Sequence, residues 1–292
     1  MPSQKDLRRR LKTVDNTKLI TRAMRSVSAS KMRKTQDRRD RIKPYANRLQ
    51  QLVANVVHSV GSEGQPLMQM KDSGKRLVVV FSSDRGLCGA FNNTIIRYAE
   101  NYIKSLTDDY EIYAIGKRAG DYFNKHGYPI YRRQGDFRGN ILMDRMMEIA
   151  EDLKNAFLNG GFNQVEIIQN YAVTAMIYRP KRDYFLPLKE DELYAGLEAE
   201  SDSDEALDYI FEPDAKTLLT DLLPKFVETK VYYTFVDAFA AEHQARMLAM
   251  AAANDNCVEL IDSLTLSMNK ARQSDITKEI LEIVSGAEAL KG

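Results

Sequence analysis

The stretch VYYTFVDAFAAEHQARMLAMAAAND, residues 231–255, lies in the middle of a segment that contains no glycine and no proline. This segment runs from residue 225 to residue 285 and is 61 residues long. At ~1.5 Å per residue, one continuous helix over it would be roughly 90 Å long. A helix of that length far exceeds those of globular domains, so the sequence predicts an elongated element that needs a partner along its side.

Apolar and small residues recur in this segment by alternating steps of four and three, the spacing of the contact stripe in a left-handed coiled coil. The expected stripe comprises Val227, Val231, Thr234, Ala238, Ala241, Ala245, Leu248, Ala252, Val258, Ile261, Leu264, Met268, Ile276, Ile280 and Ile283. Alanines dominate its middle, which lets a partner helix approach closely. Asn254 and Asp255 interrupt it, and they either fix the register of the pair or contact a surrounding protein.

A second long helix is predicted at the other end of the chain, because residues 3–43 also lack glycine and proline. Pro44 is a candidate position for a bend, and the apolar pattern continues to Gly61. The apolar stripe of the first part comprises Leu7, Leu11, Val14, Ile20, Met24 and Val27. Each long helix alone would expose its stripe, so we expect the two to pair as an antiparallel coiled coil.

Residues 75–187 show a different pattern, in which short β-rich runs such as KRLVVVF and YEIYAI alternate with stretches of helical spacing. This alternation predicts a Rossmann-like α/β domain beside the coiled coil. The expected fold class is therefore α/β with a long antiparallel coiled coil. We expect four regions: an N-terminal coiled-coil helix (1–60), the α/β domain (75–187), an acidic loop (188–214) and a C-terminal coiled-coil helix (215–292).

Charge is concentrated in two segments although the net charge is only +1. Residues 1–48 hold 16 Lys and Arg against 4 Asp, and residues 190–214 hold 11 Asp and Glu with no Lys or Arg. The acidic segment is too charged to bury and indicates a solvated loop. The basic helix suits an acidic protein surface, an anionic membrane or nucleic acid, but no groove-reading module or stacking platform accompanies it.

The sequence offers little support for disulfides, metal binding or a membrane span. Cys88 and Cys257 are the only cysteines, without the spacing of a disulfide framework or a zinc site, which favours a reducing compartment. The polar N-terminus lacks an apolar signal core, and no run approaches the ~20 apolar residues that span a bilayer. We therefore expect a soluble chain without a metal or cofactor.

The stretch SSDRGLCGAFN, residues 82–92, follows the first predicted strand and precedes a helix, where α/β folds often bind phosphate. Gly86 and Gly89 give only G-x-x-G, which lacks the remaining positions of nucleotide-binding motifs. A nucleophilic role for Cys88 would need a base, but His58, His126 and His243 are scattered along the chain. A tight structural turn is the preferred interpretation.

Three stretches resemble the γ-subunit family of F-type ATP synthases: NTKLITRAMRSVSASKMRK near the start, SSDRGLCGAFN, and the segment from ARMLAMAAANDNCVELIDSL to the end. The resemblance covers both long helices and the first strand and turn of the α/β domain, in the same order. It implies a central rotor shaft that couples ion flow through the membrane sector to ATP synthesis or hydrolysis, without a catalytic site of its own.

The resemblance also implies partners and a location. One copy of the chain would turn inside a ring of α and β subunits and stand on the ε subunit and the c-subunit ring, with no nucleic acid bound. The start MPSQKDLRRR leaves no room for a transit peptide, which suggests a bacterial chain. We then expect a peripheral protein on the cytoplasmic face of the cell membrane, with H⁺ or Na⁺ as the coupling ion.

Matching the family pattern to this sequence gives candidate contact residues between rotor and stator. They are Met24, Arg25, Lys31, Arg33, Arg246, Gln273, Thr277 and Glu279. The turn is expected to be shaped by Gly86 and Gly89 and braced by Asp84 and Arg85. Two alternatives from other classes are a basic coiled-coil scaffold that binds nucleic acid and a nucleotide-dependent enzyme that uses the α/β domain.

Overall fold

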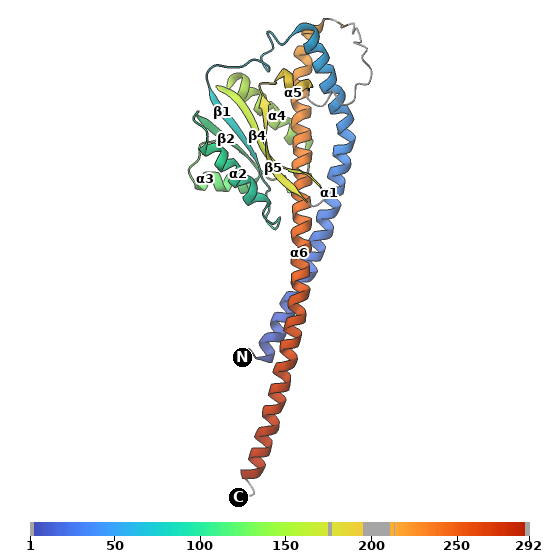
Figure 1. The fold of residues 1–292 in the computed structure, drawn as a ribbon, viewed down its shortest axis with the longest axis vertical. Coiled ribbons are helices and arrows are strands. Elements are labelled where there is room, and N and C mark those ends of the chain that lie inside the picture. Colours follow the sequence, from blue (N-terminus) through green and yellow to red (C-terminus); the bar gives the residue numbers. More distant parts are fainter. Residues whose placement is uncertain (1–2, 175–176, 195–210, 213, 290–292) are drawn as a thin grey trace. The chain divides into compact units, whose positions relative to one another are not determined.

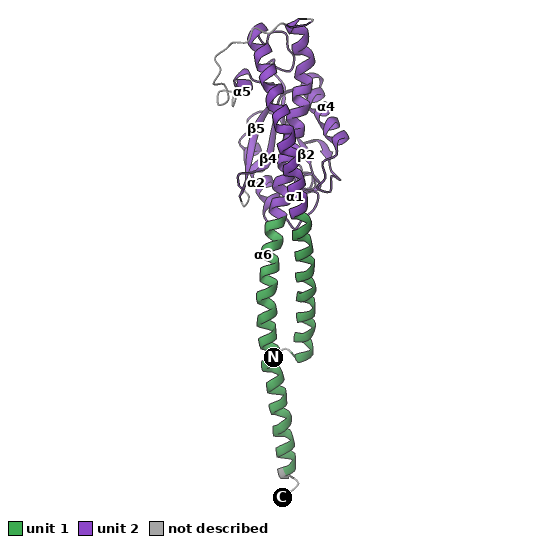
Figure 2. Ribbon diagram, turned by 90° about the vertical axis from the view of Figure 1, so that its right-hand side faces the viewer, with its two compact units in different colours: residues 1–28, 247–292 green, residues 29–246 purple. Residues whose placement is uncertain are grey.

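A computed structural model describes residues 3–174, 177–194, 211–212 and 214–289 of the chain (Figure 1). The chain divides into two compact units (Figure 2). Unit 1 contains residues 1–28 and 247–292, and unit 2 contains residues 29–246. Two long helices contribute to both units, so each unit is described by itself.

Unit 2 is built around a five-stranded sheet with the strand order β3-β2-β1-β4-β5. Its strands are β1 (Lys75–Phe81), β2 (Tyr110–Ile115), β3 (Ile130–Gln134), β4 (Phe162–Ala172) and β5 (Tyr178–Leu186). The first four strands are parallel, and β5 pairs antiparallel with β4 at one edge. This arrangement confirms the predicted Rossmann-like α/β domain.

Helices cover both faces of the sheet, which explains why strand β1 is apolar without interruption. Val78 and Val80 of β1 belong to a core with α2 (Phe91–Lys104) and α3 (Lys117–Lys125). These two helices lie on the face turned away from α6 (Figure 1). Leu77, Val79 and Phe81 belong to the core on the other face. That second core also includes residues of the two long helices and of α4 (Met143–Asn159), the short α5 (Glu190–Tyr194) and the chain around Leu67.

The two predicted long helices are present. Helix α1 (Gln4–Val60) is 57 residues long and continues through Pro44. Helix α6 (Ala215–Ala289) is 75 residues long, begins ten residues before the glycine- and proline-free segment and contains Pro224. The start of the acidic stretch forms α5, while residues 195–210 and 213 of that stretch lie outside the described residues.

The inward-facing stripe of α1 differs from the apolar stripe expected from the sequence. Ile20 and Val27 are 60% and 57% exposed, whereas Thr21 and Ser28 are buried at 7% and 3% exposure. Thr21 and Ser28 follow Leu7 at multiples of seven residues, the period that keeps one face of a helix turned toward a partner. The Thr21 hydroxyl donates to the Lys18 carbonyl of its own helix, so a buried threonine is satisfied there.

Helix α6 shows the same kind of difference within unit 1, where it lies beside α1 (Figure 2). Met250 and Cys257 are buried, whereas Ala252 and Val258 of the expected stripe are exposed. Ile276, Ile280 and Ile283, also expected in the stripe, are exposed as well. The expected stripe of α6 is therefore wrong within unit 1, where the buried residues Met250 and Cys257 lie seven residues apart on a neighbouring face of the helix.

Aromatic side chains fasten the sheet of unit 2 to α6. Phe81 of β1 packs edge-on against Phe235 and Phe239 of α6, with ring centroids 4.9 and 5.3 Å apart. Phe137, from the loop after β3, lies 5.9 Å from both rings of α6. All four rings are buried, so this cluster joins the end of two strands to one face of the long helix.

Replacing Phe239 with Ala should therefore lower the free energy of unfolding of the full chain by about 3–5 kcal/mol, because it leaves a cavity among three aromatic rings. Urea unfolding followed by circular dichroism measures this change. Leu281→Ala on the same helix is the matched control, since Leu281 is 62% exposed and its loss should change stability by less than about 0.5 kcal/mol. Equal effects of the two changes would contradict the packing described.

Candidate functional site

The turn after β1 is held by hydrogen bonds within the stretch 82–92. The backbone N–H and the hydroxyl of Ser83 both lie 3.0 Å from the Asn92 side-chain oxygen. The backbone has positive φ at Leu87 (61°) and Gly89 (59°), and Gly86 does not have positive φ. A left-handed conformation is unusual for leucine, and the Leu87 side chain is 62% exposed. The turn is thus shaped by Leu87 together with Gly89.

Asp84 connects the turn to two neighbouring segments. Its carboxylate accepts a hydrogen bond from the backbone N–H of Lys117 at 3.1 Å and another from the backbone N–H of Arg138 at 2.8 Å. Arg85 contributes its backbone carbonyl, which accepts a hydrogen bond from the Ser83 hydroxyl, and its side chain is exposed. Asp84 therefore holds the turn against the start of α3 and the loop after β3.

The helix that follows the turn is α2, but the turn also lies against the N-terminus of α3, where its side chains accept hydrogen bonds from the first backbone N–H groups. The Ser82 hydroxyl accepts a hydrogen bond from the Ala119 N–H at 2.8 Å, and Asp84 occupies the Lys117 N–H. Gly116 just before the helix has φ 88°, and a Cβ there would lie 2.1 Å from the Ser82 carbonyl oxygen. The turn and the helix start are packed against each other, which favours a structural role.

Cys88 is buried in a small cluster with Phe91, Ala241 and Ala245. Two of these residues belong to the alanine stripe of α6, so their small side chains admit the turn as well as a partner helix. His126 contacts the Tyr122 carbonyl on α3, and His243 contacts the Gly139 carbonyl. Across the residues that the structure describes, no group of three His, Cys, Asp or Glu side chains is arranged to hold a metal ion.

Arg246 of α6, a predicted contact residue, is only 8% exposed and binds groups of its own chain. Its guanidinium lies 2.8 Å from the Glu242 carboxylate, one helical turn earlier. It also donates to the backbone carbonyls of Gly86 at 3.4 Å and Arg85 at 3.3 Å. Arg246 thereby joins α6 to the turn after β1.

Lys31 of α1, another predicted contact residue, also binds within unit 2. Its ammonium group donates to the Arg138 carbonyl and to the Asn140 side-chain oxygen, both at 3.2 Å. Partial burial lowers the pKa of Lys31, and the nearby Arg85 acts in the same direction. The loop after β3 is thus attached to α1 by Lys31 and to the turn by Asp84.

Glu242 and His243 lie at the centre of this arrangement, and both are buried at 2% exposure. Burial raises the pKa of the Glu242 carboxyl, while Arg246 opposes that shift. His243 Nε2 lies 2.9 Å from the Gly139 carbonyl oxygen and so carries the proton that it donates. Burial lowers the pKa of His243 to about 4. Gly139 has φ 68° and fits closely, since a Cβ there would lie 2.7 Å from the His243 ring.

The remaining predicted contact residues are spread along the long helices and are not brought together. Met24 is half-buried, and Arg25 and Arg33 of the same helix are exposed. On α6 the exposed candidates are Gln273, Thr277 and Glu279. The Thr277 hydroxyl donates to the Gln273 carbonyl, a bond within one helical turn. These residues are available to a partner, whereas Lys31 and Arg246 already have bonds in this chain.

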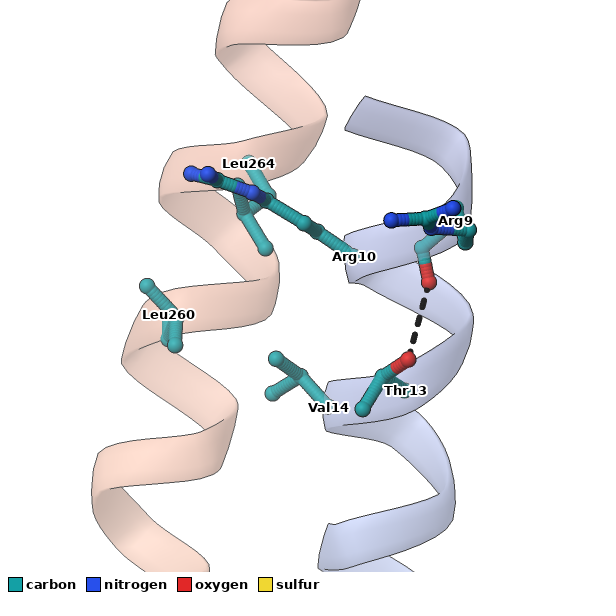
Figure 3. A pocket seen from close by; sticks show the side chains of 6 residues that line it. All are labelled: Arg9, Arg10, Thr13, Val14, Leu260 and Leu264. Atoms are coloured by element: carbon teal, nitrogen blue, oxygen red, sulfur yellow. Dashed lines mark hydrogen bonds between the residues drawn. The ribbon is translucent and has the colours of Figure 1, made fainter. Parts of the chain in front are cut away.

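A hollow of about 310 Å³ lies between the two helices of unit 1 (Figure 3). Its six lining residues are Arg9, Arg10, Thr13, Val14, Leu260 and Leu264. The Thr13 hydroxyl donates to the Arg9 carbonyl of its own helix. The lining of the hollow contains neither a nucleophile with a base nor a carboxylate. The hollow marks a place where the side chains of the two helices do not fill the space between them.

Comparison with known proteins identifies the family. A family model described as ATP synthase matches residues 3–290. The ATP synthase gamma chains of Flavobacterium johnsoniae and Pelotomaculum thermopropionicum are 39% and 37% identical to this chain, each over 100% of both sequences. This chain belongs to the ATP synthase gamma-chain family. A gamma chain is the central-shaft subunit of ATP synthase, and it is a non-catalytic subunit of that complex.

Chains in solved ATP synthase structures share the fold of this chain. A chain of the Euglena gracilis mitochondrial ATP synthase (OSCP/F1/c-ring, rotational state 3) matches with a TM-score of 0.68 at 19% identity, over 98% of this chain and 94% of that chain. A chain of the Tetrahymena thermophila central stalk and c-ring matches with a TM-score of 0.59 at 22% identity, over 80% of this chain and 99% of that chain. The gamma-chain fold is thus shared at low sequence identity. In the part of the chain that the structure describes, no helix has the length and apolar character needed to cross a membrane.

Sequence reasoning missed Glu242 and Gly139 as members of the network around the turn. A buried glutamate has no distinctive spacing, and its partner Arg246 one turn later looks like an ordinary surface ion pair. The pair EH at residues 242–243, within an alanine-rich and otherwise apolar run, was the available signal. Polar residues inside such a run are expected to have partners elsewhere in the fold.

Burial of neutral His243 should make this gamma chain less stable as the pH falls. The His243 ring takes up a proton near pH 6.5 in the unfolded chain and only near pH 4 in the folded chain. The contribution of neutral His243 to the free energy of unfolding is therefore complete above pH 6.5 and is lost as the pH falls from 6.5 to 4. The loss attributable to His243 should reach at most about 3 kcal/mol.

Urea unfolding of the full chain between pH 7 and pH 4 tests this, with His243→Gln as the comparison. Glutamine retains an N–H donor toward Gly139 but does not titrate, and the opposite contribution of Glu242 is common to both proteins. The difference in stability between wild type and variant should shrink as the pH falls through this range. A difference that is constant with pH would rule out a neutral buried His243.

Proposed function

We propose that this chain is the rotating shaft of an ATP synthase, which couples ion flow through the membrane sector to ATP synthesis or hydrolysis on an α and β subunit ring. The observation that supports this most strongly is the outer surface of unit 1. Large apolar side chains there are exposed, among them Leu19, Ile20, Val27, Val258, Leu266, Ile276, Ile280, Leu281, Ile283 and Val284.

The distribution of polar and apolar side chains at these positions is the reverse of that in an ordinary two-helix coiled coil. Thr21 and Ser28 are buried in unit 1, while Ile20 and Val27 are exposed. Contiguous exposed apolar surface is unfavourable in water and typical of a surface that a partner covers. Figure 2 shows that α6 continues past the end of α1 within unit 1, so its last turns have no helix of this chain beside them. A surrounding ring of α and β subunits would cover these residues.

The charged residues suit contacts that break and reform during rotation. Arg25 and Arg33 are exposed, and ion pairs of exposed side chains contribute only about 0–1 kcal/mol each. Such contacts can exchange between successive acidic partners without trapping the shaft in one position. With Met24, and with Gln273, Thr277 and Glu279 on the other helix, they form the proposed contact set toward the stator. Lys31 and Arg246 would reach a partner only by leaving their present bonds.

We propose different roles for different parts of the chain. The parts of the coiled-coil helices in unit 1, residues 1–28 and 247–292, turn within the ring. The α/β domain, 75–187, and the lower shaft that packs against it in unit 2 stand on the ε subunit and the c-subunit ring. We place a single copy at the cytoplasmic face of the membrane as a peripheral subunit, with H⁺ or Na⁺ as the transported ion.

Assembly tests the proposal directly. The purified chain alone should show no ATP hydrolysis, and adding it to isolated α and β subunits should give a complex in which a probe on the shaft rotates during hydrolysis. Failure to join such a ring would refute the proposal. Tight, salt-sensitive binding of DNA by the chain would favour the scaffold alternative, and ATP binding that Gly86→Ala abolishes would favour the enzyme alternative.

Adding a charge at Met24 should impair coupling more than assembly, because Met24→Lys creates a new ion pair at a contact that has to slide. In the assembled complex, ATP synthesis driven by an ion gradient should fall several-fold more than ATP hydrolysis does. Ser26→Lys is the matched control, since Ser26 is exposed on the opposite side of the same helix and should leave the ratio unchanged. Unchanged synthesis and hydrolysis in Met24→Lys would contradict this prediction.

A further inference from the structure

Polar groups of unit 2 meet where the carboxyl ends of β1 and β3 approach the two long helices. The polar joint, as we call it, consists of Glu242 and Arg246 of α6, Lys31 of α1, Asp84 and Asn140 of the loops, and the backbone carbonyls of Arg85, Gly86 and Arg138. It contains bonds from α6 to the turn after β1, from α1 to the loop after β3, and between the two loops. The sequence had assigned two of its members, Lys31 and Arg246, to contacts with other subunits.

The bonds of the polar joint form a closed circuit. Arg246 holds the turn after β1 on α6, and Asp84 of that turn binds the Arg138 N–H in the loop after β3. The carbonyl of Arg138 in turn accepts a hydrogen bond from Lys31 of α1. His243, beside the polar joint, bonds α6 to this loop through the Gly139 carbonyl and so closes the circuit back to α6. Each loop is thus fixed to a helix and to the other loop.

We infer that the polar joint fixes the α/β domain in one rotational register on the shaft helices, so that torque passes between domain and shaft without slip. This inference rests on the proposed rotor function and deepens it. Its residues are positioning residues, because none of them is placed at a site of chemistry. Glu242 is the member with no other function proposed for it, and it is the least exposed of the charged side chains involved.

Apolar packing alone would not fix this register well. The rings of Phe81 and Phe137 lie against Phe235 and Phe239, and such contacts resist separation but depend weakly on direction. Hydrogen bonds lose strength steeply when donor and acceptor move out of line, so they resist sliding and turning. The Glu242 carboxylate, one helical turn from Arg246 on the same helix, holds the Arg246 guanidinium in position and so keeps it directed at the carbonyls of the turn.

The position of the joint along the helices suits the transfer of torque. Arg246 is the last residue of unit 2 on α6, and Lys31 lies two residues after the first residue of unit 2 on α1. Torque exchanged between the α/β domain and the rest of the shaft has to pass through the helices at these residues. An ion pair that joins the domain to α6, Lys154 with Glu228, lies 18 residues before Arg246, and Lys154 also has Glu151 as a partner.

The test uses the complete ATP synthase containing this chain, purified and reconstituted into liposomes. The assay measures ATP hydrolysis and, with a voltage-sensitive oxonol dye, the membrane potential that hydrolysis generates, which reports H⁺ and Na⁺ transport alike. Glu242→Gln removes the carboxylate charge at nearly constant size. It should lower the potential generated per ATP hydrolysed by about threefold or more while hydrolysis changes by less than about twofold.

Glu228→Gln is the matched control, because it removes the same charge from another glutamate of α6, one that forms an ion pair directly with the α/β domain. It should leave the transport per ATP within about 20% of wild type, since Lys154 keeps Glu151 as its partner. Asp84→Ala is a second variant for the case that the Glu242 variant does not assemble. This change removes the hydrogen bond between Asp84 and the Arg138 N–H, which joins the two loops, at an accessible position. Like Glu242→Gln, it should lower transport per ATP.

The outcomes separate the inference from the proposed function. Suppose that the wild-type complex couples transport to hydrolysis and that Glu242→Gln and Asp84→Ala both show normal transport per ATP. This result would refute the inference about the polar joint and leave the rotor proposal intact. Equal losses in Glu242→Gln and Glu228→Gln would also overturn it, because the effect would then belong to any ion pair on α6. Absence of this chain from the purified complex would count against the rotor function itself.

Discussion

The alanine stripe of α6 is the constraint on which the rest of unit 2 depends. Ala238 belongs to the core beneath the sheet, and Ala241 and Ala245 contact Cys88 and Phe91 of the turn after β1. Because these side chains are small, the end of the sheet comes close enough for the Arg246 guanidinium to reach backbone carbonyls of the turn. Larger residues at these positions would keep the sheet and helix apart and leave the Arg246 guanidinium without the backbone carbonyls of the turn.

This close approach also gives buried polar groups a role that apolar packing does not supply. The aromatic cluster around Phe81 holds domain and helix together, while His243 and Arg246 bind defined atoms of two loops and Glu242 holds Arg246 in position. The result is one unit in which a sheet and two helices have a fixed relation. Unit 1 follows a different rule, because Thr21 and Ser28 are buried there as well as Leu7 and Met250, while many other apolar side chains are exposed.

The candidate site could be predicted only in part. A resemblance between sequences selects residues such as Lys31 and Arg246 but says nothing about which groups they bind. Their partners include backbone carbonyls, which have no sequence signal, and Gly139, which matters because the His243 ring lies against it. The exposed candidates Arg25, Gln273 and Thr277 remain predictions, since only a partner subunit would give them contacts.

The sequence by itself determined the two long helices and the alternating strands and helices between them. Absence of glycine and proline over 61 residues and a continuous apolar run such as LVVVF are local properties, and backbone propensity and burial on both faces act on them directly. Only the tertiary structure decided which face of each helix turns inward. Thr21 and Ser28 are buried instead of Ile20 and Val27 because helix faces are chosen by how closely two backbones approach, and that depends on residues far apart in the chain.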